Sequence, residues 1–158
     1  MRSAKSILSL YFAKYIVRKN NKWKKNAVKY QEKIMHDLIF KAKNTLFGKD
    51  HNFKDIKNYS DFKNHINISD YEGLQKYIDK LKLGEKNILW PGKPIYFCKT
   101  SGTTSGSKYI PITKDSMSCH LKPARDAILS YINETQNTSL GDGKMIFLQG
   151  SPVLSQTN

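Results

Sequence analysis

The segment K-T-S-G-T-T-S-G-S-K-Y-I-P-I-T, residues 99–113, decides how this chain is interpreted. Every residue between Lys99 and Lys108 is Ser, Thr or Gly. The runs on either side, residues 95–98 and 109–112, are β-branched or aromatic and predict two strands. The polar run is therefore predicted to be a loop between two strands at hairpin distance, rich in residues that tolerate positive φ.

Such a loop can turn backbone N–H groups and hydroxyls toward one point, an arrangement that suits a phosphate, and Lys108 adds a positive charge. A flexible surface turn is the alternative interpretation. The kinase-type pattern G-x-x-x-x-G-K-[ST] does not fit, because only three residues separate the two glycines and a serine precedes the lysine. The candidate phosphate-binding residues are Thr100, Ser101, Gly102, Thr103, Thr104, Ser105, Gly106 and Lys108.

This run resembles the phosphate-binding signature T-S-G-T-T-(G/S)-x-x-K of the acyl-adenylate-forming superfamily. Ser107 stands where a proline commonly precedes the lysine, which departs from ordinary acyl-CoA synthetases. Three further stretches are F-G-K-D at 47–50, Y-E-G-L-Q-K-Y-I at 71–78 and G-E-K-N-I-L at 84–89. Together with the loop they resemble the auxin-responsive promoter family of acyl-acid amido synthetases, in particular its bacterial members.

The resemblance implies an ATP-dependent ligase that activates a carboxylic acid as an acyl adenylate and transfers it to an amine. It implies ATP and Mg²⁺ as cofactors, with a small-molecule carboxylic acid and an amine or amino acid as partners. It assigns no catalytic residue and no magnesium ligand within this chain. Two alternatives stay open: a coenzyme A ligase that passes the adenylate to a thiol, and a non-enzymatic basic module that binds RNA or an anionic membrane.

The order of the predicted elements indicates an α/β fold, with helices first and a mixed sheet carrying the phosphate loop later. We expect an N-terminal helix and basic segment over residues 1–25, a helical region over 26–94 and strands with the nucleotide loop over 95–158. Residues 145–148 are predicted to form a strand. Relatives are several times longer and have a mobile C-terminal domain. We therefore expect this chain to be the N-terminal part of one large adenylate-forming domain, incomplete and inactive alone, and a complete small domain is the alternative.

Local patterns predict the helices. Apolar residues at three- and four-residue steps indicate a helix over residues 28–46, with Gly48 as its C-terminal cap. A capping-box pattern opens a helix over residues 69–82, with an apolar stripe that is expected to be core. A third helix is predicted over residues 114–134, where Pro123 should bend or split it.

The formal net charge of +14 invites a nucleic-acid interpretation, but only 3 of the 27 basic residues are arginine. Readers of base sequence rely on arginine forks, so we expect no specific nucleic-acid partner. Any binding to DNA or RNA should be independent of sequence and should weaken steeply between low and moderate salt. Competition binding at physiological salt tests this, and a discrimination above about tenfold between unrelated sequences would contradict it.

Cys98 and Cys119 lack C-x-x-C spacing, so two buried reduced thiols are expected rather than a zinc site or a disulfide framework. Residues 7–17 are apolar apart from Ser9 and Lys14, a run shorter than the roughly 20 residues that a membrane span needs. We expect no transmembrane segment and a cytoplasmic protein. A helix packed on its own domain is favoured for this run, and a surface helix on anionic lipid is the alternative.

Overall fold

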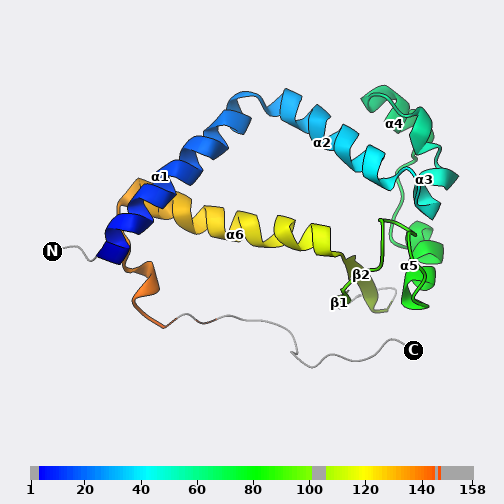
Figure 1. The fold of residues 1–158 in the computed structure, drawn as a ribbon. Coiled ribbons are helices and arrows are strands. Elements are labelled where there is room, and N and C mark those ends of the chain that lie inside the picture. Colours follow the sequence, from blue (N-terminus) through cyan, green and yellow to red (C-terminus); the bar gives the residue numbers. More distant parts are fainter. Residues whose placement is uncertain (1–3, 101–105, 145, 147–158) are drawn as a thin grey trace. The chain divides into compact units, whose positions relative to one another are not determined.

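The structure is a computed structural model that describes residues 4–100, 106–144 and 146 (Figure 1). Its helices are α1 Ala4–Lys25, α2 Ala27–Ala42, α3 Leu46–Asp50, α4 Tyr59–His65, α5 Gln75–Lys82 and α6 Lys114–Thr135. Short 3-10 helices cover Phe53–Asp55, Glu72–Leu74 and Ser139–Gly141. The strands are β1 Tyr96–Thr100 and β2 Lys108–Ile112. The predicted α/β fold, with helices first and strands later, is confirmed.

Within the described residues the sheet is one antiparallel pair, β1 with β2. Mixed strand directions in a larger sheet stay a prediction. The two strands lie where the sequence predicted a hairpin, and each extends further toward the loop. The strand predicted over residues 145–148 lies outside the described residues except for residue 146. The expected assignment of residues 1–158 to one large domain stays a prediction.

The structure divides into two compact units. One contains α1 with most of α6, and its small core is formed by Ala13, Ile16, Leu129 and Ile132. From the apolar run of α1, only Ala13 and Ile16 are buried in this core, whereas large side chains such as Leu8 and Tyr11 are exposed. Among the described residues, no helix has both the length and the apolar character that crossing a bilayer requires. The second unit contains α2 to β2 and the first turn of α6, and it holds the candidate site.

Helix α6 begins with a reciprocal cap. The Thr113 hydroxyl accepts the backbone N–H of Ser116 at 3.1 Å, and the Ser116 hydroxyl accepts the backbone N–H of Thr113 at 2.9 Å. The sequence predicted that Pro123 would bend or split this helix, and α6 is not split, because it runs from Lys114 to Thr135 with Pro123 inside it. A proline removes only one backbone donor, so a long helix can tolerate it where the flanking turns hold.

Gly48 does not cap α2, and this prediction is wrong. Helix α2 ends at Ala42, and Gly48 lies inside the separate helix α3. The buried hydroxyl of Thr45 donates to the Ala42 carbonyl at 2.7 Å and accepts the Gly48 N–H at 3.0 Å. Glycine is needed here because the backbone of residue 48 lies close to that of Ala42. A Cβ at position 48 would lie 2.1 Å from the Ala42 carbonyl oxygen.

Helix α5 starts later than the capping-box pattern predicted. The Asp70 carboxylate, and not the Ser69 hydroxyl, accepts the backbone N–H of Gly73 at 2.9 Å. A 3-10 turn over Glu72–Leu74 follows, and the α-helix itself begins at Gln75. A carboxylate accepts hydrogen bonds more strongly than a hydroxyl does. The capping residue is therefore Asp70, one residue later than the sequence pattern predicted.

The predicted apolar stripe of α5 is confirmed as core. Its members Tyr77, Ile78 and Leu81 are buried together with Ile88 from the following turn, and the fourth member, Leu74, is partly buried against them. The Tyr77 ring packs edge-on against Phe47 of α3, with ring centroids 5.1 Å apart. Through this contact α3 and α5 share one apolar cluster, and the hairpin packs against the same cluster.

The two cysteines differ from expectation, since Cys98 and Cys119 are both exposed free thiols. Cys98 pairs with Ile110 across the hairpin, and both side chains are exposed. Successive side chains of a strand point to opposite faces, and Phe97, the neighbour of Cys98, packs against the core. An apolar sequence context therefore did not imply burial for Cys98.

Replacing Tyr77 with phenylalanine keeps the ring and removes the hydroxyl that donates to Asp50 at 2.8 Å. Tyr77 is 2% exposed, so we expect the free energy of unfolding to fall by about 1–2 kcal/mol at pH 7. Urea unfolding of the wild type and Tyr77→Phe measures this difference. The exposed Tyr59→Phe is the matched control and should change little.

The same comparison has a predicted pH dependence. Burial raises the pKa of Tyr77 above 10.0, and the hydrogen bond to Asp50 adds to this effect. Above pH 10 the Tyr77 phenol of the unfolded chain releases its proton, whereas that of the folded chain retains it, so this group favours unfolding in the wild type and makes no such contribution in Tyr77→Phe. The stability difference between the wild type and Tyr77→Phe should therefore shrink as the pH rises above 10. A difference that stays constant up to pH 11 would contradict this account.

Candidate functional site

The candidate loop joins the ends of the hairpin. Thr100, the last residue of β1, pairs with Lys108, the first residue of β2. Gly106, just before β2, is exposed and has a φ of +84°, a conformation that glycine adopts without strain. The positive φ expected of this loop is thus present at that position.

Only part of the predicted site can be described. Thr100, Gly106 and Lys108 have defined positions, and the hairpin places Thr100 opposite Lys108. The other candidates, Ser101, Gly102, Thr103, Thr104 and Ser105, lie outside the described residues. The assignment of all eight residues to phosphate binding stays a prediction.

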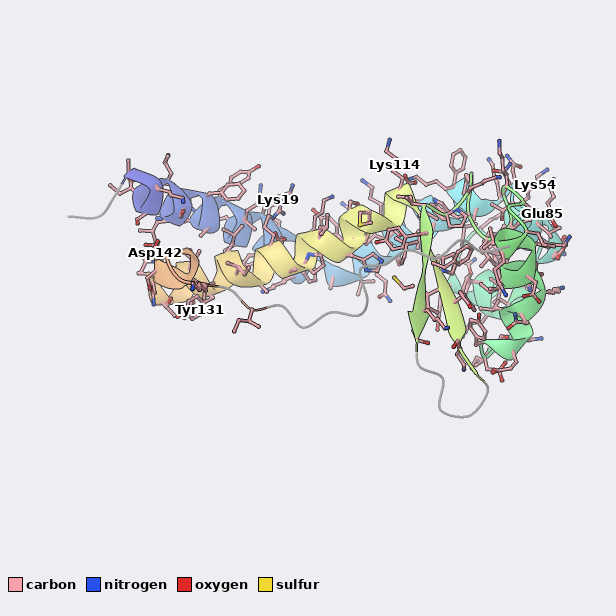
Figure 2. All side chains as sticks on the ribbon, turned by 90° about the horizontal axis from the view of Figure 1, so that it is seen from below. Lys19, Lys54, Glu85, Lys114, Tyr131 and Asp142 are labelled. Carbon is pink, nitrogen blue, oxygen red and sulfur yellow. The ribbon has the colours of Figure 1, made fainter. Side chains whose placement is uncertain are left out.

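The hairpin rests on α5 through one of its two faces. Phe97 of β1 and Tyr109 of β2 pack against the buried cluster of α5 and the turn after it. Their rings meet edge to face, with centroids 6.4 Å apart. Figure 2 shows the two strands side by side next to α5. The Lys82 ammonium lies 4.8 Å from the centroid of the Tyr109 ring, over its face. These contacts fix the strand that carries Lys108 to a helix with a buried apolar stripe.

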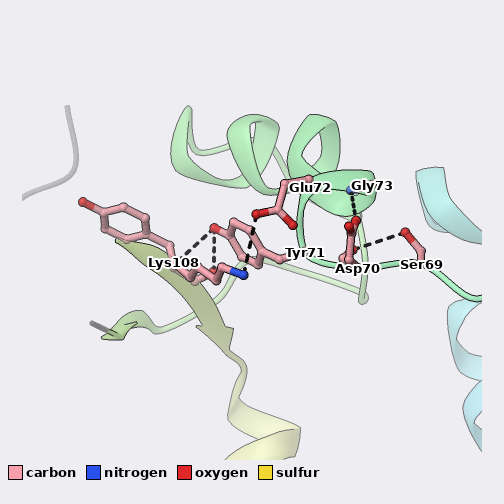
Figure 3. Close-up of polar contacts among 7 residues, drawn as sticks. Ser69, Asp70, Tyr71, Glu72, Gly73 and Lys108 are labelled. Carbon is pink, nitrogen blue, oxygen red and sulfur yellow. Dashed lines mark hydrogen bonds and ion pairs between the residues drawn. The ribbon is translucent and has the colours of Figure 1, made fainter. Parts of the chain in front are cut away.

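Tyr71 holds the backbone of β2 directly after Lys108. Its hydroxyl accepts the backbone N–H of Tyr109 at 2.9 Å and also lies 3.5 Å from the carbonyl oxygen of Tyr109, to which it can donate. The turn that presents Tyr71 is stabilised by the bond between the Asp70 carboxylate and the Gly73 N–H (Figure 3). A single side chain therefore satisfies both polar groups of one strand residue.

The Lys108 ammonium lies against the same turn. Its nitrogen is 3.6 Å from a carboxylate oxygen of Glu72 and 5.3 Å from the centroid of the Tyr71 ring (Figure 3). The side chain of Lys108 is 34% exposed and that of Glu72 is 52% exposed. An ammonium at this depth is positioned by its neighbours and still open to an anion from solvent.

Sequence reasoning did not connect Tyr71 and Glu72 with the loop. It used the Y-E-x-L stretch for the helix start and the family resemblance, because local patterns carry no information about long-range contacts. The Y-E-x-L motif was the one signal that could have suggested this contact, because two motifs of the same family can lie together in the folded chain. The F-G-K-D stretch also contacts another motif of the family. The carboxylate of Asp50, at its end, accepts a hydrogen bond from the hydroxyl of Tyr77 in the Y-E stretch.

Across the described ranges, no three His, Cys, Asp or Glu side chains gather so that they could hold a metal ion. The carboxylate beside Lys108 is that of Glu72, which is paired with the ammonium.

The hairpin places Thr100 opposite Lys108, and these residues are the two ends of the run that resembles the phosphate-binding signature of adenylate-forming enzymes. A family model described as the GH3 family N-terminal domain matches residues 17–157, nearly the whole chain. The chain therefore belongs to the GH3 family, the auxin-responsive family of acid–amino acid ligases, and the predicted resemblance is confirmed. A search of curated proteins gives no significant match.

Proposed function

We propose that this protein contributes the phosphate-binding part of an ATP-dependent ligase, which activates a carboxylic acid as an acyl adenylate and transfers the acyl group to the amine of an amino acid. Membership of the GH3 family supports the class of reaction. The observation that supports a specific binding site is the position of Lys108, which lies at the end of the hairpin and opposite Thr100.

The proposed reaction has two steps. A carboxylate oxygen attacks the α-phosphorus of ATP, the bond from that phosphorus to the bridging oxygen breaks, and pyrophosphate leaves. The amine nitrogen then attacks the acyl carbon, AMP leaves with the carboxylate-derived oxygen, and the nitrogen loses a proton. The first step brings two anions together, so fixed positive charge and fixed donors are needed around the phosphates.

The residues at the hairpin end suit this requirement. The Lys108 ammonium is partly exposed, Thr100 is exposed, and a Cβ built at Gly106 would meet no atom within 4 Å. In the proposal, Lys108 binds the β- and γ-phosphates, while loop hydroxyls and backbone N–H groups bind the remaining oxygens. Mg²⁺ bound to the phosphates would neutralise charge on the leaving pyrophosphate. No residue of the chain is assigned as its ligand.

Exchange of labelled pyrophosphate into ATP tests the proposal in the full-length protein. We expect exchange that depends on one carboxylic acid within a panel of aryl, indolyl and aliphatic acids. Addition of amino acids should then yield an amide and AMP. Amide formation absent with every amino acid, but thioester formation with coenzyme A, would favour the thiol-transferring alternative. Absence of acid-dependent exchange under conditions where the protein is folded would contradict the proposal.

A further inference from the structure

Tyr71 and Glu72 have no role in the function proposed above, yet they contact Lys108 and the residue after it. Tyr71 contributes two separate contacts: its hydroxyl binds the backbone of Tyr109, and its ring lies 5.3 Å from the Lys108 ammonium. Glu72 contributes a carboxylate oxygen 3.6 Å from that ammonium. Two groups of one turn, the Tyr71 ring and the Glu72 carboxylate, thus contact the Lys108 side chain, and the Tyr71 hydroxyl binds the backbone of the next residue.

The strengths of these contacts differ in kind. The hydroxyl contact involves the half-buried backbone of β2, where loss of a partner leaves polar groups unsatisfied. The pair between Lys108 and Glu72 is partly exposed, and such pairs contribute little because solvent screens them. The backbone contact can therefore fix the strand, whereas the ion pair can open when a stronger anion arrives.

We propose that Tyr71 and Glu72 are positioning residues for Lys108, Tyr71 as a fixed support and Glu72 as a counter-ion that phosphate displaces. Tyr71 holds the strand so that the lysine stays at the hairpin end. Glu72 holds the ammonium beside the Tyr71 ring until the triphosphate takes its place. This inference rests on the proposed function, because it requires a polyphosphate as the competing anion.

The inference predicts opposite effects of two conservative substitutions in the full-length protein. Tyr71→Phe removes the hydroxyl and keeps the ring, so binding of ATP should weaken by about three- to tenfold. Glu72→Gln removes the charge that competes with phosphate, so binding should tighten by about two- to fivefold. Calorimetric titration with ATP and with inorganic triphosphate measures both, and the second ligand isolates the phosphate contacts from those of the adenosine.

Matched controls separate positioning from general damage. Glu85→Gln breaks the pair with Lys80, an exposed ion pair at 3.2 Å in the same unit, and should leave ATP binding unchanged. In a Lys108→Met background the Glu72→Gln effect should disappear, because the charge that Glu72 holds is gone. Thermal unfolding of each variant checks that the fold is intact.

The possible outcomes distinguish a failure of the inference about Glu72 from a failure of the proposed function. If the wild type binds ATP and Lys108→Met weakens binding, but Glu72→Gln behaves like Glu85→Gln, the inference about Glu72 is wrong and the proposed function stands. Tighter binding with Glu72→Gln that persists in the Lys108→Met background would also overturn it. If the wild type binds neither ATP nor triphosphate, the proposed function fails, and the inference fails with it.

Discussion

Replacing Lys108 with alanine in the full-length protein is expected to slow acyl-adenylate formation at least tenfold, a loss of roughly 1.4 kcal/mol of transition-state stabilisation. Negative charge develops on the departing pyrophosphate, and in our account the Lys108 ammonium lies where it can stabilise that charge. The side chain is 34% exposed, so removing it leaves no large cavity. Fold stability should therefore change by less than about 1 kcal/mol.

Rates of acid-dependent pyrophosphate exchange measure the effect at saturating ATP and at low ATP. Lys86→Ala is the matched control, since Lys86 is an exposed lysine in the turn after α5 and is not part of the candidate loop. Ser101→Ala, based on the sequence signature, should lower the rate by at least about tenfold as well. Exchange rates unchanged in both Lys108→Ala and Ser101→Ala would refute the phosphate-binding assignment of the loop.

Replacing Gly48 with alanine is expected to give the largest loss of stability, about 3 kcal/mol. The new Cβ would lie 2.1 Å from the carbonyl oxygen of Ala42 and 3.0 Å from the Cα of Lys43, both of them backbone atoms. Relief requires that α2 and α3 move apart at the corner. That movement would strain the two hydrogen bonds of Thr45, a side chain that is 1% exposed.

Urea unfolding of Gly48→Ala against the wild type measures this loss. Gly143→Ala is the control, because a Cβ there meets no atom within 4 Å and the backbone is not in a positive-φ conformation. The two substitutions add the same methyl group, so their difference isolates the close approach at the corner. Equal stabilities of the two variants would show that α2 and α3 are not held together as described.

The elements that the sequence predicted correctly depend on local signals. The hairpin follows from two β-branched and aromatic runs that flank a polar loop, and the α5 stripe follows from a three- and four-residue spacing. The end of α5 is equally local: Gly84 has a φ of +81°, and its N–H bonds to the carbonyl of Leu81 at 3.0 Å. Each of these features needs only a few neighbouring residues to be specified.

The features that the sequence missed depend on contacts between distant segments. Gly48 was assigned as a cap because glycine often ends helices, whereas its actual constraint is the backbone of Ala42. The exposure of Cys98 depends on which face of the hairpin is covered. The contact between Glu72 and Lys108 depends on the hairpin packing beside the turn before α5. No pattern within a short window contains this information.

The central claim is that a carboxylate of the substrate attacks the α-phosphorus of ATP, and isotope transfer tests it most directly. The acid identified by pyrophosphate exchange would be labelled with oxygen-18 in its carboxylate and converted to the amide by the full-length protein. Mass spectrometry of the nucleotide products should then find one labelled oxygen in the phosphate of AMP. Label in inorganic phosphate, with ADP as the nucleotide product, would contradict the account.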